Sequence, residues 1–337
     1  MSHDSPRSVL IIHPGGLGDV LLSLPAIVSI RNRYPAHRIL LMAESEVGHL
    51  LQACRVVDHV IPTEAGDLAG LFSGAQQISV STRQWAERCD LAVGWLKDPD
   101  GAFRSTLEQL RVRQVVVESP TPRPGVHQSR RFFDTLEKLP GDRTWPAHLF
   151  VPDQFRETGA DVLRAVGIQR EQAVVLCHPG SGSRHKCIRS EIMAEIIQKV
   201  QQRKFTPVIV GGPADDDAVE RLRHGGLHTL PVIQRQRLAT LAGILTHARL
   251  FIGHDSGLTH LAALIQRPTV AIFGPTDPRQ WAPQGAHVSV VTGRPCSCPN
   301  WEFVRACTEK SCLSVSPDDV VTAAFSVLGR YREVTKS

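Results

Sequence analysis

The turn at 254–257 reads HDSG and joins an apolar run to a segment with apolar residues at helical spacing, so a strand, a turn and a helix are predicted. Unpaired N–H groups at the helix start favour an anion, and Ser256 and Gly257 let a phosphate approach the backbone. The carboxylate of Asp255 suits sugar or ribose hydroxyls, or a helix cap, and His260 faces back toward the turn. We expect a phosphate-bearing ligand here; a capped strand–helix unit without a ligand is the alternative.

A second strand, glycine-rich turn and helix are predicted near the start of the chain, where HPGGLGD follows the apolar run 8–12. Asp19 comes directly after Gly15, Gly16 and Gly18, so the turn can present its carboxylate at the end of the strand. The glycine spacing is not that of a dinucleotide fingerprint, and the turn has no P-loop lysine. Asp19 is therefore a candidate general base, with a structural N-cap as the alternative.

The second half of the chain repeats this pattern, with a strand at 173–177 followed by HPGSGSRHK. Backbone N–H groups and the hydroxyls of Ser181 and Ser183 around Gly182 suit a diphosphate, and Lys186 supplies a positive charge. The next strand, at 207–210, ends in GGPADDD. We interpret the acidic run 215–217 as a solvated helix start.

Alternation of strands and helices along the chain predicts parallel sheets with helices on both faces, an α/β fold. A length of 337 residues favours two domains. The Gly/Pro/Trp-rich stretch 140–152 is the expected linker, which gives domains 1–152 and 153–337. The expected strands are 8–12, 38–42, 56–61, 78–80, 91–93, 114–117, 173–177, 207–210, 250–252 and 269–273.

The composition is that of a soluble globular protein, with 42% hydrophobic residues, 21% charged residues and a net charge of +5. This modest charge does not favour a nucleic-acid partner. Six arginines between Arg104 and Arg131, Arg130 among them, are candidates to steer an anionic acceptor, with a solvated helix face as the alternative. No segment approaches 18 apolar residues, and the start lacks the features of a signal peptide, so a cytoplasmic protein is expected.

Four of the eight cysteines fall within seventeen positions near the end of the chain. Their spacing, C-x-C-x8-C-x4-C, differs from that of the usual zinc sites, whose ligand pairs are two to four residues apart. We expect a thiol-rich or disulfide-prone loop rather than a zinc or iron site. The four residues are Cys296, Cys298, Cys307 and Cys312.

The glycine-rich and acidic loops GGLGD, GSGSRHK, GGPADDD and HDSGLTH, the last followed by GPTDP, resemble in this order those of the heptosyltransferase family, glycosyltransferase family 9. The resemblance extends from Val9 to about Val321. It implies a GT-B fold, with two Rossmann-like domains facing each other across a cleft. The first domain would hold the acceptor and the second the nucleotide, and a terminal helix near 317–328 would pack back across the domains.

The resemblance also implies roles for residues of the second domain. Lys186 matches the lysine that contacts the nucleotide phosphates, and Ser181, Gly182 and Ser183 lie in the matching phosphate loop. Asp215 matches, less closely, the acidic residue near the ribose. The donor-site signature is matched by Asp255, Ser256, Gly257 and His260.

In the first domain, Asp19 matches the general base of the family. Gly15, Gly16 and Gly18, with Arg104 and Arg130, would lie on the acceptor side. Two departures bear on which donor and acceptor are used. Many members have Trp-Pro where this chain has Ile188-Arg189, and a basic residue where it has His13-Pro14.

The implied reaction is an inverting transfer of heptose from ADP-heptose to a lipopolysaccharide core or similar glycan, without a metal or other cofactor. Asp19 would take the acceptor proton, and Lys186 with the helix N-termini after 183 and 256 would stabilise the leaving diphosphate. The implied location is the cytoplasm or the cytoplasmic face of the inner membrane. The alternatives are a catalytically silent nucleotide-sugar-binding protein and a nucleotide-sugar epimerase; the glycine spacing disfavours an NAD-dependent oxidoreductase.

Overall fold

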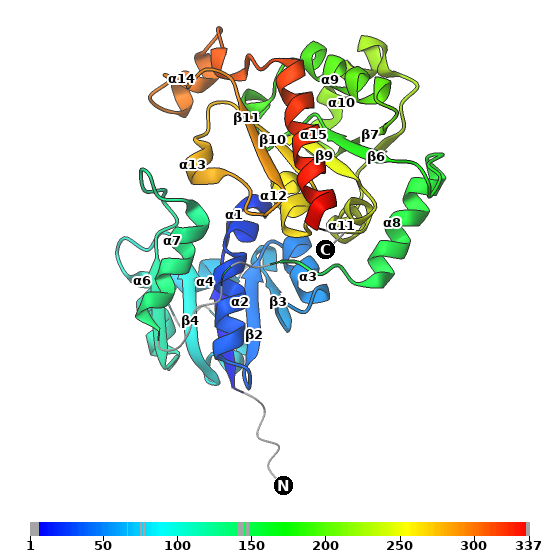
Figure 1. Cartoon of the computed structure of the whole chain (residues 1–337). Helices are drawn as coiled ribbons and strands as arrows, with labels where there is room; N and C mark the ends of the chain where they lie inside the picture. The colour runs from blue at the N-terminus through cyan, green and yellow to red at the C-terminus, as the bar shows by residue number, and fades with distance from the viewer. Residues whose placement is uncertain are drawn as a thin grey trace. The chain divides into compact units, whose positions relative to one another are not determined.

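The computed structural model describes residues 7–65, 67–74, 76, 78–139, 145 and 148–334. The chain divides into two compact units, Met1–Ala147 and His148–Ser337, which follow one another from blue to red in Figure 1. The sequence pattern places the boundary a few residues later, after 152. Of the expected linker, residues 140–144, 146 and 147 lie outside the described part of the chain.

The first unit contains a parallel sheet with the strand order β3-β2-β1-β4-β5. The order reverses beside β1, where Leu10 lies between Leu40 of β2 and Ala92 of β4. Ligands of open α/β sheets bind at the carboxyl ends of the strands at such a reversal, so the turn after β1 is in position for a site. The strands are β1 (Ser8–Ile12), β2 (Arg38–Ala43), β3 (His59–Pro62), β4 (Cys89–Trp95) and β5 (Gln114–Glu118).

The helices of the first unit depart from the sequence expectation at two places. The single helix expected over 20–34 is two helices that meet at Ser23, whose Oγ donates to the Val20 carbonyl at 2.8 Å, and Pro25 stands in the first turn of the second helix. The strand expected at 78–80 is wrong: Ser79 caps α5 by accepting the Thr82 N–H. The helices are α1 (Leu17–Leu22), α2 (Leu24–Arg33), α3 (Ser45–Ala53), α4 (Asp67–Ser73), α5 (Val80–Ala86), α6 (Ala102–Gln109) and α7 (Gln128–Asp134).

The second unit contains a parallel sheet with the order β11-β10-β9-β6-β7-β8. Numbered from its own first strand, this is the 3-2-1-4-5-6 order of doubly wound nucleotide-binding folds, and it reverses between β6 and β9. The strands are β6 (Val174–His178), β7 (Thr206–Gly211), β8 (Val232–Gln234), β9 (Leu250–His254), β10 (Thr269–Phe273) and β11 (Val288–Thr292). The expected α/β class with parallel sheets is confirmed in both units.

Helices cover the sheet of the second unit (Figure 1). The last helix, α15, packs on α9, β10 and β11 and buries Val320, Ala324 and Val327. Helices α8 and α11 approach closely at Gly159 and Gly243. There is no room for a side chain at this contact, since a Cβ on Gly159 would lie 2.4 Å from the Gly243 carbonyl carbon. The helices are α8 (Asp153–Ala165), α9 (Ser190–Gln202), α10 (Asp216–Leu222), α11 (Leu238–Thr246), α12 (Gly257–Leu264), α13 (Pro278–Trp281), α14 (Trp301–Ala306) and α15 (Pro317–Val334).

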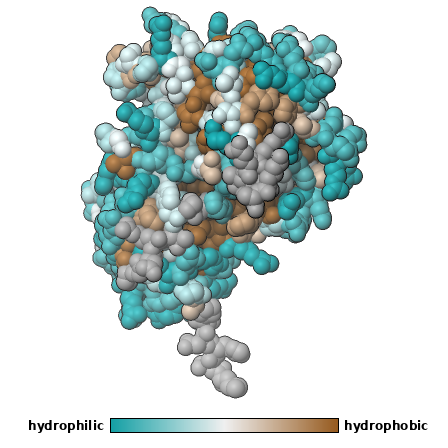
Figure 2. All heavy atoms as spheres, in the orientation of Figure 1, coloured by the Kyte–Doolittle hydropathy of each residue, from teal (hydrophilic) through white to brown (hydrophobic). Residues whose placement is uncertain are grey.

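The central strands are buried along their whole length, as expected for parallel strands covered on both faces. This burial explains why their sequences are continuous apolar runs rather than alternating patterns. Figure 2 shows a mostly hydrophilic surface in which apolar residues gather in small patches. Among the described residues, no helix combines the length and apolar character needed to cross a membrane.

Candidate functional site

Three adjacent strands of the second sheet, β9, β6 and β7, end in the loops that the sequence analysis singled out. The loop after β6 runs from 179 to 189, the turn after β9 from 255 to 256, and the turn after β7 from 212 to 215. Because the strands are parallel neighbours, their carboxyl ends bring these loops together. The candidate donor site is therefore one continuous group of residues within the second unit.

Lys186 and Asp255 form an ion pair at the centre of this group. Nζ of Lys186 lies 2.8 Å from Oδ2 of Asp255, which also accepts a hydrogen bond from Oγ1 of Thr276 at 2.8 Å. His260 lies on the other side, with Nε2 3.9 Å from Oδ1 of Asp255. The residues predicted from the sequence in the loop after β6 and in the HDSG turn are thus in direct contact. Thr276 of the GPTDP turn joins them.

The electrostatic surroundings keep the Asp255 carboxylate ionised. The side chain is only 6% exposed, and burial alone raises a carboxyl pKa. The interactions of the carboxylate with His260 and with Lys186 outweigh this effect and lower the pKa of Asp255 to about 2. A fixed negative charge therefore holds the Lys186 ammonium, whose side chain is 22% exposed, at the edge of the loop.

A second chain of contacts links the same three loops below the surface. Nε2 of His178 lies 3.0 Å from Oδ2 of Asp215, and Nδ1 of His178 lies 3.3 Å from Oγ of Ser256. Asp215 also accepts the Gly212 N–H at 2.7 Å, and the bond from His178 contributes to lowering the pKa of Asp215 against the effect of burial. All three side chains are buried. The interpretation of Asp215 as part of a solvated helix start is therefore wrong; its carboxylate faces inward, toward His178 at the end of β6 and the Gly212 N–H.

His254 forms hydrogen bonds with both ends of the loop that carries Lys186. Its Nε2 accepts the Ile188 N–H at 3.1 Å, so the neutral ring carries its proton on Nδ1, which donates to the Gly180 carbonyl at 3.2 Å. Complete burial lowers the pKa of His254 to about 4. The ring is thus a neutral bridge that fixes the loop between 180 and 188. Ile188, at the position of the first expected departure from the family pattern, is buried.

The hydroxyls of the loops are used to hold the backbone. Ser256 is the N-cap of α12 and accepts the Thr259 N–H, so the alternative that Asp255 caps this helix is wrong. Ser181 donates to the Asp255 carbonyl at 2.6 Å, and Ser183 caps the short turn that contains Lys186. Gly182 has no atom within 4 Å of the position that a Cβ would occupy. Gly257 is the first residue of α12, so its N–H belongs to the free donors of a helix start.

The turn after β1 places Asp19 in the first turn of α1, together with Gly18. Gly16 is the N-cap of this helix, so the alternative that Asp19 is itself the cap is wrong. Gly15 is required by space, because a Cβ there would lie 2.8 Å from both Asp19 Cβ and His13 Cε1. The half-buried carboxylate of Asp19 is thus held at the carboxyl end of β1, where the strand order of the first sheet reverses.

His13 supports this turn from below. It is 1% exposed, its Nδ1 accepts the Gly15 N–H at 3.2 Å, and its ring packs against Trp95 and Phe132. Burial lowers the pKa of His13 to about 4, so the ring is neutral at pH 7. The position where many family members carry a basic residue is therefore filled here by an uncharged, structural histidine.

The two predicted acceptor-side arginines lie on different helices and have intramolecular partners. Arg104 of α6 donates to the Val115 carbonyl at 2.7 Å. Arg130 of α7 pairs with Asp134 at 2.6 Å and is mostly exposed. These contacts give each guanidinium a fixed place, and an acceptor role for either stays a prediction.

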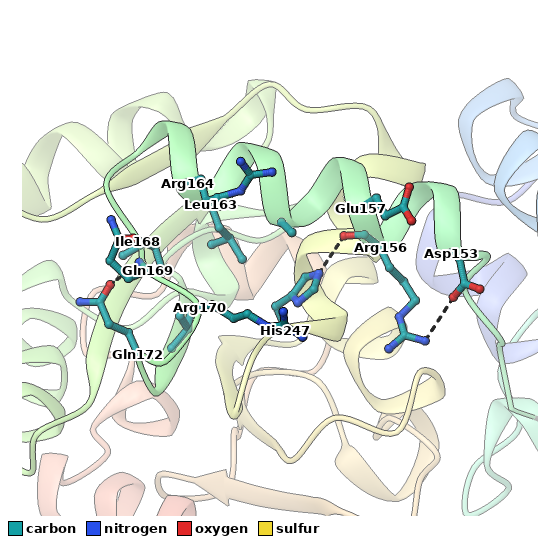
Figure 3. A pocket seen from close by; sticks show the side chains of 12 residues that line it. Asp153, Arg156, Glu157, Leu163, Arg164, Ile168, Gln169, Arg170, Gln172 and His247 are labelled. Carbon is teal, nitrogen blue, oxygen red and sulfur yellow. Dashed lines mark hydrogen bonds and ion pairs between the residues drawn. The ribbon is translucent and has the colours of Figure 1, made fainter.

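A pocket of about 720 Å³ lies elsewhere in the second unit, between α8 and the segment that leads into β6 (Figure 3). Arg156, Arg164, Arg170 and His247 line it, and His247 Nε2 lies 2.7 Å from the Arg156 carbonyl. The pocket includes Val174, the first residue of β6, whereas the candidate site lies beyond the last residue of that strand. It contains none of the candidate site residues.

Sequence reasoning missed three residues of the second unit that organise the site. His178 and His254 each end a buried strand, and Thr276 lies in the GPTDP turn. The signal was a polar residue at the end of an apolar run: His178 stands just before a glycine-rich loop, and His254 is the first residue of the HDSG turn. Such a residue lies at the sheet edge, where it can bond to the loops of both neighbouring strands.

Residues 99–312 match the family model for glycosyltransferase family 9 (heptosyltransferase). Curated relatives include lipopolysaccharide heptosyltransferase 3 of Escherichia coli K12, which is 32% identical over 126 residues, or 36% of each chain. Lipopolysaccharide heptosyltransferase 1 of Pseudomonas aeruginosa is 45% identical over 65 residues, or 18% of each chain. The matched segments thus span about a third or less of the length of these curated relatives.

Two solved structures share the fold over nearly their whole length. The glycosyltransferase family 9 protein of Veillonella parvula superposes with a TM-score of 0.81 at 19% identity and covers 96% of this chain and 98% of its own. ADP-heptose lipopolysaccharide heptosyltransferase II of E. coli gives a TM-score of 0.74 at 18% identity, with coverage of 96% and 99%. The expected GT-B fold class is confirmed by these structures, and from the match of its own residues 99–312 the chain belongs to glycosyltransferase family 9, the heptosyltransferase family.

Proposed function

We propose that the protein is an inverting glycosyltransferase that transfers a heptose or related sugar from an ADP-sugar to a lipopolysaccharide core or similar glycan. Family membership supports the reaction class. The proposed place of action is the cytoplasm or the cytoplasmic face of the inner membrane, where such an acceptor is assembled. The donor, the acceptor and the stereochemical outcome are the parts of the proposal that experiment must test.

The observation that carries the proposal is the ammonium of Lys186 held by the ionised Asp255 beside the start of α12. Loss of a nucleoside diphosphate leaves negative charge on phosphate oxygens, and preorganised positive charge stabilises such a transition state. The Asp255 carboxylate holds the Lys186 ammonium in one orientation, while the N–H groups at the start of α12 offer further donors. Asp255 is thus a positioning residue for the lysine, in addition to any contact with sugar hydroxyls.

Asp19 is the proposed general base of the first unit. Its carboxylate would accept the proton of the acceptor hydroxyl while the new glycosidic bond forms, a role that contributes about 10²–10⁴ in rate. The oxygen of the acceptor then attacks the anomeric carbon from the face opposite the diphosphate, which inverts its configuration. In this scheme no metal ion or other cofactor is needed, because Lys186 and the helix N-termini take up the charge of the leaving group.

The test is donor binding followed by transfer. Calorimetric titration with ADP, UDP and GDP should select ADP, and Lys186→Ala should weaken ADP binding by about 1–3 kcal/mol, the range for losing a charged hydrogen-bond partner. Lys199→Ala is the matched control, because Lys199 lies on α9 and pairs with the exposed Asp318. Incubation of the full chain with ADP-heptose and a heptose-deficient lipopolysaccharide core should then yield a product of inverted anomeric configuration. Tight ADP binding without transfer to any core acceptor would contradict the proposed reaction, and turnover of the donor without an acceptor would indicate an epimerase.

A further inference from the structure

The segment between β11 and α15 gathers four cysteines around the short helix α14. Desolvation and the neighbouring thiols of Cys296 and Cys307 raise the pKa of Cys298, and desolvation and the neighbouring thiol of Cys296 raise the pKa of Cys312. All four are free thiols in this structure. Residues separated by up to sixteen positions in the sequence are therefore adjacent, as the expectation of a thiol-rich loop requires.

The arrangement favours chemistry between pairs of thiols. Within the described residues, no three His, Cys, Asp or Glu side chains are grouped so that they could hold one metal ion. Cys296, Cys298 and Cys307 are partly exposed, whereas Cys312 is buried, and of the three exposed thiols Cys298 and Cys307 flank α14. An oxidant in solution thus has access to the Cys298–Cys307 pair.

The two thiols of this pair have different surroundings. Sγ of Cys307 accepts the Lys310 N–H at 3.4 Å, and this bond lowers the pKa of Cys307. Desolvation raises the pKa of Cys298 to about 11. Since the thiolate is the reactive form, Cys307 is the attacking group and Cys298 the resolving one.

Helix α14 connects this pair to the candidate donor site. Its first residue, Trp301, places its ring with the centroid 5.8 Å from Nζ of Lys186, within the range of a cation–π contact. The side chain of Asn300 caps the helix by accepting the N–H groups of Glu302 and Phe303. The span between Cys298 and Cys307 therefore contains the whole helix and the ring that lies over the lysine.

We propose that Cys298 and Cys307 form a reversible disulfide that closes the chain around α14 and fixes Trp301 beside Lys186. The oxidant is a low-molecular-weight disulfide such as oxidised glutathione. The Cys307 thiolate attacks one of its sulfurs and releases the first glutathione thiolate, which leaves a mixed disulfide on Cys307. Cys298 loses its proton to solvent and attacks that sulfur, so the protein disulfide forms and a second glutathione leaves. Two cysteine thiols are oxidised and one glutathione disulfide is reduced.

The disulfide changes the freedom of α14 rather than its fold. A closed loop of eight intervening residues restricts the helix in the oxidised protein, and preorganised binding groups bind their ligands more tightly. We therefore expect the oxidised protein to bind ADP at least about threefold more tightly than the reduced protein. This effect on ADP rests on the proposed function, whereas formation of the disulfide does not.

The first experiment identifies the bond. The full chain is equilibrated with reduced and oxidised glutathione at fixed ratios, alkylated, digested and analysed by mass spectrometry. The expected product is a linked peptide pair containing Cys298 and Cys307, which is lost in Cys298→Ser and in Cys307→Ser. Cys54→Ser is the control, because Cys54 is also partly exposed but burial raises its pKa to about 12. A stable mixed disulfide on Cys307, or a metal ion that occupies the four thiols of the purified protein, would overturn the proposal.

The second experiment tests the connection with Lys186. ADP affinity is measured by calorimetry for the reduced and oxidised forms of the wild type, Cys298→Ser and Trp301→Ala. The redox difference should appear only in the wild type. Equal ADP affinity of the two wild-type forms would overturn the connection through Trp301. If neither form bound ADP, the proposed donor would be wrong, while the disulfide would stand on the mass-spectrometric result.

Discussion

Lys186 and Asp255, 69 positions apart in the chain, form an ion pair with an Nζ–Oδ2 distance of 2.8 Å in which the carboxylate is nearly completely buried. In the sequence, neither residue stands next to a residue of opposite charge. The pair exists because β6 and β9 are neighbours in the sheet, so that the loop after one strand meets the turn after the other. The energetics of this pair can be tested directly.

Removing one partner of the Lys186–Asp255 pair should destabilise the fold more than removing both. Asp255→Asn leaves a partly buried ammonium without its counter-ion, and Lys186→Met leaves a buried carboxylate, so each should lower the free energy of unfolding by about 2–4 kcal/mol. The loss of unfolding free energy in the double variant should be smaller than the sum of the two single losses by more than about 1 kcal/mol, as measured by urea denaturation. The surface pair Lys199–Asp318 is the control and should give little or no coupling, because solvent screens the two charges. Additive effects at Lys186 and Asp255 would mean that the contact contributes no net coupling.

Two glycines of the same loop should respond differently to alanine. A Cβ on Gly180 would lie 1.7 Å from Oδ1 of Asp215, so Gly180→Ala must displace that carboxylate from His178 and Gly212. We expect a loss of about 1–3 kcal/mol in unfolding free energy, as for other overpacked sites. Gly182→Ala meets no atom within 4 Å and should leave stability within about 0.5 kcal/mol. Weaker ADP binding by a stable Gly182→Ala variant would support a close approach of phosphate; equal stability of the two variants would contradict the packing described for Asp215.

Acid should weaken the fold in a window set by His254. Its pKa is about 4 in the folded protein and 6.5 in the unfolded chain, so the unfolded chain binds more protons between these values. The contribution of His254 to the free energy of unfolding is therefore fully present above pH 6.5. Up to about 3 kcal/mol of it is lost as the pH falls toward 4. His13 titrates in the same direction and window. Urea denaturation between pH 7 and 4 should show this slope, and His254→Gln, which keeps a donor and an acceptor, should reduce it; an unchanged slope would exclude His254 as its source.

Asp19→Asn should separate catalysis from folding. Gly16 caps α1, so the substitution leaves the N-cap in place while it removes the favourable charge in the first turn of the helix, and it should cost no more than about 1 kcal/mol of stability. Turnover should fall at least about 10²-fold, with most of the loss in kcat, because the proton transfer belongs to the transition state. ADP affinity should stay at the wild-type value. Near-normal transfer by Asp19→Asn would show that the base lies elsewhere.

Much of the fold could be read from local patterns. Apolar runs bounded by glycine-rich turns identified the buried strands β1, β6, β9 and β10, because a strand covered on both faces has no polar alternation. Short elements were harder. The strand expected at 78–80 is part of a capped helix start, since Ser79 uses its hydroxyl to bind the Thr82 N–H and Val80 is exposed. Three residues give too little periodicity to distinguish these outcomes.

The sequence by itself determined which loops carry chemical groups: the carboxylate after Gly18, the Gly/Ser loop with Lys186, and the HDSG turn. Residue types and their spacing along one segment are local properties, and they suffice for this. Only the tertiary structure decided what each group does. It joined Lys186 to Asp255, turned Asp215 inward to His178, made His254 a neutral bridge and placed Trp301 over Lys186. These contacts depend on strand order and burial, which bring distant loops to one sheet edge and set the charges of His254 and Asp255 there.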